Sequence, residues 1–65
     1  MANSFSDIIE GFVAGGTAAD SLHAAAQRER DDVALAERVL MTFTEYENSS
    51  WDEAELRSRM KRLLS

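Results

Sequence analysis

The chain has 65 residues, a formal net charge of −5, 45% hydrophobic residues, and neither cysteine nor proline. This length allows one small domain, residues 1–65, and the absence of cysteine excludes disulfides as a source of stability. An acidic chain is a poor nucleic-acid binder by default. No apolar run approaches the length of a membrane span, so we expect no membrane association and a cytoplasmic location.

The first predicted helix begins near Ser4, which can cap it while Asp7 three residues later completes a capping box. Apolar residues then recur at helical spacing and predict an amphipathic helix that packs on the core. They are Phe5, Ile8, Ile9, Phe12 and Val13. The pair Gly15-Gly16 is expected to end this helix, with one glycine in the left-handed conformation.

The second predicted helix begins after Thr17, a candidate N-cap, and its end is ambiguous. Residues 27–32, QRERDD, are polar on every face. The helix either runs unbroken from Ala18 to Glu47, or it breaks and Asp31 or Asp32 caps a new one. We favour the continuous helix, because no glycine or proline marks a break.

Two neighbouring apolar rows lie between residues 32 and 47. The first is Val33, Ala36, Leu40 and Phe43, and the second is Leu35, Val39, Thr42 and Tyr46. Together they form a face too wide for a single covering helix. We expect Leu40 and Phe43 to be buried in the core.

The last predicted helix follows Asn48-Ser49-Ser50, with Ser50 as its N-cap and Glu53 as the capping-box partner. Leu56, Met60, Leu63 and Leu64 share one face.

The resulting fold is all-α, with a short first helix, a long central helix and a short third helix. Since these two short helices cannot cover both rows, Leu35, Val39 and Tyr46 would stay exposed, and we expect helical hairpins to pair as a dimeric bundle.

No motif indicates catalysis, a cofactor or a metal site. Asp20 and His23 have the spacing of a metal-binding pair on a helix, but the chain has no second such pair. Nucleophilic catalysis has little support, because the chain has no cysteine to act as a nucleophile and only one histidine to act as a base. We therefore do not expect an enzyme.

Charge divides the chain into two parts. Residues 1–55 carry twelve acids and three arginines, whereas residues 56–65 carry only cations, namely Arg57, Arg59, Lys61 and Arg62. Our leading interpretation is a regulator or inhibitor that binds another protein through Leu35, Val39 and Tyr46, with Glu37 and Glu45 beside them. The alternative is a dimeric regulator that binds nucleic acid through the four C-terminal cations.

Overall fold

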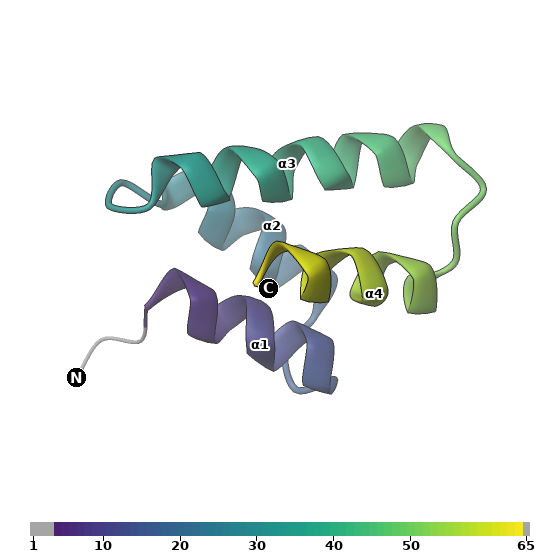
Figure 1. Ribbon diagram of the computed structural model, residues 1–65, viewed down its shortest axis with the longest axis horizontal. Coiled ribbons are helices and arrows are strands. Elements are labelled where there is room, and N and C mark those ends of the chain that lie inside the picture. Colours follow the sequence, from purple (N-terminus) through teal and green to yellow (C-terminus); the bar gives the residue numbers. More distant parts are fainter. Residues whose placement is uncertain (1–3, 65) are drawn as a thin grey trace.

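A computed structural model describes residues 4–64, and this part of the chain is all-α with no strand. Its helices are α1 (Phe5–Ala14), α2 (Ala19–Arg28), α3 (Val33–Asn48) and α4 (Glu53–Leu63). Each helix packs on its neighbours in the sequence, and α4 returns to pack on α1, which closes a ring (Figure 1). None of the described helices combines the length and the apolar character needed to cross a membrane.

The predicted long central helix is wrong, because the chain breaks between Arg28 and Val33. Glu29 ends α2 in an extended conformation, and Asp32 caps α3 by accepting a hydrogen bond from the Leu35 N–H at 3.4 Å. The Asp32 N–H in turn donates to the Glu29 carboxylate at 2.9 Å. Two carboxylates therefore satisfy the exposed amides of the break without glycine or proline.

Packing explains why the break is favoured over a continuous helix. A straight helix would extend α2 away from α3, whereas the break lets α2 fold back and contact it. Leu22 of α2 then becomes fully buried and Ala26 nearly so. Burying one leucine stabilises by about 1.5–3 kcal/mol, whereas helix propensities differ by at most about 0.7 kcal/mol among ordinary residues.

Both predicted features of α1 are confirmed. Ser4 and Asp7 form a reciprocal capping box at its start. At its end Gly15 adopts φ 92°, its N–H donates to the Phe12 carbonyl at 3.0 Å, and the Gly16 N–H donates to the Gly11 carbonyl at 2.8 Å. This pair of bonds is a Schellman motif, which turns the chain toward α2.

Two predicted N-caps are wrong by one or two residues. Thr17 belongs to the end of α1, where its N–H donates to the Gly11 carbonyl at 3.2 Å, and Ala18 precedes α2 without a side-chain cap. Asp52, rather than Ser50, caps α4 by accepting from the Glu55 N–H at 2.9 Å. Asp52 thus replaces Ser50 as the cap of α4, whereas α2 begins without a side-chain cap.

The core draws on all four helices and is entirely hydrophobic within residues 4–64. It consists of Phe5, Ile9, Phe12, Leu22, Ala26, Ala36, Val39, Phe43, Leu56 and Met60. The prediction for Phe43 is confirmed, but Leu40 is only half-buried. The centre of the buried face of α3 lies between the two predicted rows, and α2 and α4 cover it from either side.

The left-handed glycine gives a first prediction. Gly15→Ala should lower the free energy of unfolding by about 1–2 kcal/mol, because a Cβ is unfavourable at positive φ. Gly16→Ala is the matched control, since it has no positive φ and its Cβ would make only an ordinary 3.6 Å contact. Urea denaturation of both variants checks this. Equal midpoints would contradict the left-handed assignment.

Candidate protein-binding surface

The face of α3 that points away from α2 and α4 carries two exposed hydrophobic side chains. Met41 is 64% exposed and Val33 is 49% exposed, and the other large hydrophobic residues of the described range are buried or half-buried. Met41 follows the fully buried Val39 by two residues, which is about 200° around a helix. It therefore points almost directly away from the core.

Acidic side chains alternate with these two residues. Val33, Glu37, Met41 and Glu45 follow one another at intervals of four, so they form a single row along α3, which we call the α3 outer stripe. Glu37 and Glu45 are exposed and form no ion pair among residues 4–64. The stripe is therefore apolar and anionic in alternation.

The predicted apolar binding patch of Leu35, Val39 and Tyr46 is not an exposed surface in the structure. Val39 is fully buried in the core and cannot reach a partner, which corrects the expectation that it stays exposed. Leu35 and Tyr46 are half-buried against the same core. The cause is the fold-back of α2, which covers the row that two short helices alone would have left open. Glu37 and Glu45, which the sequence predicted beside this patch, are exposed.

The C-terminal cations do not form one free positive patch. Arg57 pairs with Glu53 at 3.4 Å, and its guanidinium carbon lies 5.6 Å from the centre of the Phe12 ring. Arg59 donates its Nε–H to Glu55 at 2.9 Å and stacks on Trp51, 3.9 Å from the ring centre. These contacts neutralise and orient two of the four predicted phosphate-binding side chains.

Lys61 and Arg62 lie beyond these pairs, in the last turn of α4. Both are exposed and neither forms an ion pair among the described residues. Their position also lets them complement the negative end of the helix dipole. The positive charge that remains available to a phosphate is thus smaller than the sequence suggests.

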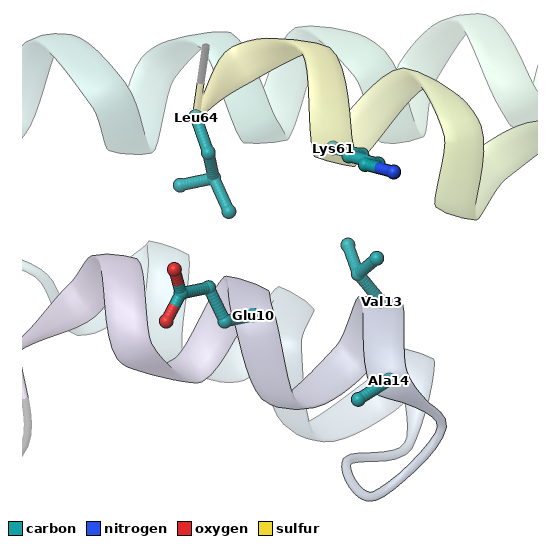
Figure 2. Close-up of a pocket in the computed structure, with 5 residues that line it drawn as sticks. All are labelled: Glu10, Val13, Ala14, Lys61 and Leu64. Carbon is teal, nitrogen blue, oxygen red and sulfur yellow. The ribbon is translucent and has the colours of Figure 1, made fainter.

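A groove between α1 and α4, of about 310 Å³, was not anticipated from the sequence. Glu10, Val13 and Ala14 line it from α1, and Lys61 and Leu64 line it from the end of α4 (Figure 2). Residues so far apart in the chain share a site only because α4 returns to α1. Amphipathic patterns within single helices therefore carry no signal for it.

In the Asp20–His23 pair, which has the spacing of a metal-binding pair, the histidine packs against an aromatic ring of α3. The His23 ring meets the Phe43 ring edge to face, with centroids 5.0 Å apart and an interplanar angle of 79°. Asp20 is exposed. Within the described part of the chain, no group of three metal-capable side chains comes together.

Comparison with protein-family models, with curated proteins and with solved structures gave no match.

Proposed function

We propose that this chain is a small protein-binding regulator or inhibitor, acting in the cytoplasm, that docks on its partner through the α3 outer stripe. The observation that carries the proposal is the exposure of Val33 and Met41 in one row with Glu37 and Glu45, two acids that form no ion pair among residues 4–64. A single exposed apolar residue is ordinary. Two exposed apolar residues in one row, separated by a carboxylate, provide contact area for a partner and select for a partner with positive charge.

The stripe favours a partner with apolar side chains and cations at matching spacing. A flexible methionine adapts to irregular apolar surfaces, and the carboxylates would favour lysine or arginine next to them. Because each step of four residues turns about 40° around the sixteen-residue helix α3, the stripe offers a docking edge that is inclined to the helix axis. The core on the other side of α3 would hold that edge rigid.

The proposed docking role of the α3 outer stripe is tested by measuring how tightly stripe variants bind the partner protein. Protein captured from extracts of the native host by immobilised wild-type chain would be identified, purified and then titrated directly. Glu37→Lys should weaken its binding by at least about tenfold, the effect of losing roughly 1.4 kcal/mol at a central contact. Met41→Ser should act in the same direction.

Glu47→Lys provides the matched control, because Glu47 is an exposed acid on the same helix but outside the stripe. It should leave the affinity for the partner within about twofold of wild type, as expected for a change at the rim of an interface. Equal losses for Glu37→Lys and Glu47→Lys would contradict the stripe and point to general electrostatic attraction.

Nucleic-acid binding by a dimer remains the alternative, and Lys61 and Arg62 are the cations that favour it. The discriminating variant is Lys61→Gln combined with Arg62→Gln, which keeps the contacts of Arg57 and Arg59 with Phe12 and Trp51 intact. We expect this variant to bind the protein partner normally. A strongly salt-dependent complex with DNA or RNA that collapses in the variant would support the alternative instead.

A further inference from the structure

The α1–α4 groove has charges and apolar side chains placed at alternate corners. Figure 2 shows Glu10 and Leu64 facing each other at one end, and Val13 and Lys61 facing each other at the other end. The two charged residues therefore lie on one diagonal of the groove, and the two apolar residues lie on the other.

This arrangement is self-complementary under a two-fold rotation. A two-fold axis along the Val13–Leu64 diagonal brings each of these residues against its own copy, and it carries Glu10 of each copy to the side of the axis where Lys61 of the other copy lies. Both carboxylates then meet an ammonium group, and the apolar corners meet each other. Isologous interfaces of this kind are the commonest way in which identical chains associate.

We propose that two copies of this chain associate through the α1–α4 groove. Glu10 and Lys61 are exposed and form no ion pair among residues 4–64, so both are available to a second copy. Val13 and Leu64 are half-buried and Ala14 is exposed, so each copy contributes apolar surface as well. This interface replaces the pairing of α3 with α3 that the sequence suggested.

The α3 outer stripe is a poorer surface for self-association. Glu37 and Glu45 give it two negative charges, and the exposed Arg38 beside it supplies only one positive charge, so pairing it with its own copy would leave a net repulsion. The two surfaces are therefore separate, and the dimer does not depend on the proposed partner. Stable interfaces remove about 800 Å² per partner, and five lining residues supply only part of this, so the association is weak and reversible.

The test is sedimentation equilibrium from about 10 µM to about 1 mM, where a weak dimer gives a concentration-dependent mass. Glu10→Lys and Lys61→Glu should each raise the dissociation constant about tenfold, because each turns two attractive pairs into two repulsive ones. The variant carrying both reversals should return to within about threefold of wild type, because the attractive pairs are restored with their signs exchanged.

Arg62→Glu is the matched control, since it makes the same charge change at an exposed site on α4 that does not line the groove. It should leave the dissociation constant unchanged, as should Glu37→Lys in the outer stripe. A monomer throughout the concentration range would overturn the proposal. So would a dimer that ignores the single reversals, or one that the double reversal fails to restore.

Discussion

Phe12→Ala is expected to remove much or all of the stability of the fold. Phe12 is fully buried, and it joins the α1 side of the core to Arg57 of α4. Truncating a buried phenylalanine costs about 3–5 kcal/mol. A domain of 65 residues has a total stability of about 3–10 kcal/mol at about 0.05–0.15 kcal/mol per residue, so the loss removes much or all of it.

Circular dichroism during urea denaturation measures this loss. Val13→Ala is the matched control on the same helix, because Val13 is only half-buried and its truncation should cost about 1 kcal/mol or less. Similar denaturation midpoints for the two variants would show that α1 and α4 do not meet around Phe12.

Leu22→Ala should destabilise the protein by about 2–5 kcal/mol, because this fully buried side chain is how α2 covers α3. Leu40 is only half-buried, although the sequence predicted it in the core. Leu40→Ala should therefore lower the free energy of unfolding distinctly less than Leu22→Ala does. The same urea experiment ranks the two. A larger effect at Leu40 than at Leu22 would contradict the observed position of the core on α3.

Features that depend on a few neighbouring residues could be predicted from the sequence. The capping box of Ser4 and Asp7 and the left-handed Gly15 are local hydrogen-bond and backbone effects, and both are present. The apolar face of residues 32–47 was predicted only in part, because helical spacing placed Ala36, Val39 and Phe43 on the face that is buried but also placed the exposed Val33 there.

The break at residues 29–32 could not be predicted because its cause lies elsewhere in the chain. Local preference in QRERDD allows either a helix or a turn, and the burial of Leu22 on α3 decides between them. The error had a direct consequence for the predicted site. Without the fold-back of α2, Val39 seemed to need a partner, whereas the chain itself covers it.

The outer stripe was missed for a related reason. Helical spacing alone places Val33 in the first apolar row and leaves Met41 outside both rows. Once Val39 is known to be the centre of the buried face, helical geometry places Met41 on the opposite side. The α1–α4 groove lies further beyond sequence reasoning, since it needs the return of α4 to α1.

The most direct test of the account is a nuclear Overhauser measurement between the His23 and Phe43 rings. The exposed outer stripe requires α2 to fold back on α3 within one chain, which puts these ring centroids 5.0 Å apart. In a continuous helix the two residues would be separated by about 30 Å at 1.5 Å per residue. A strong cross-peak, undiminished when labelled chains are diluted with unlabelled ones, is the predicted result. No cross-peak, or one that appears only between chains, would contradict the fold-back and the exposed stripe that depends on it.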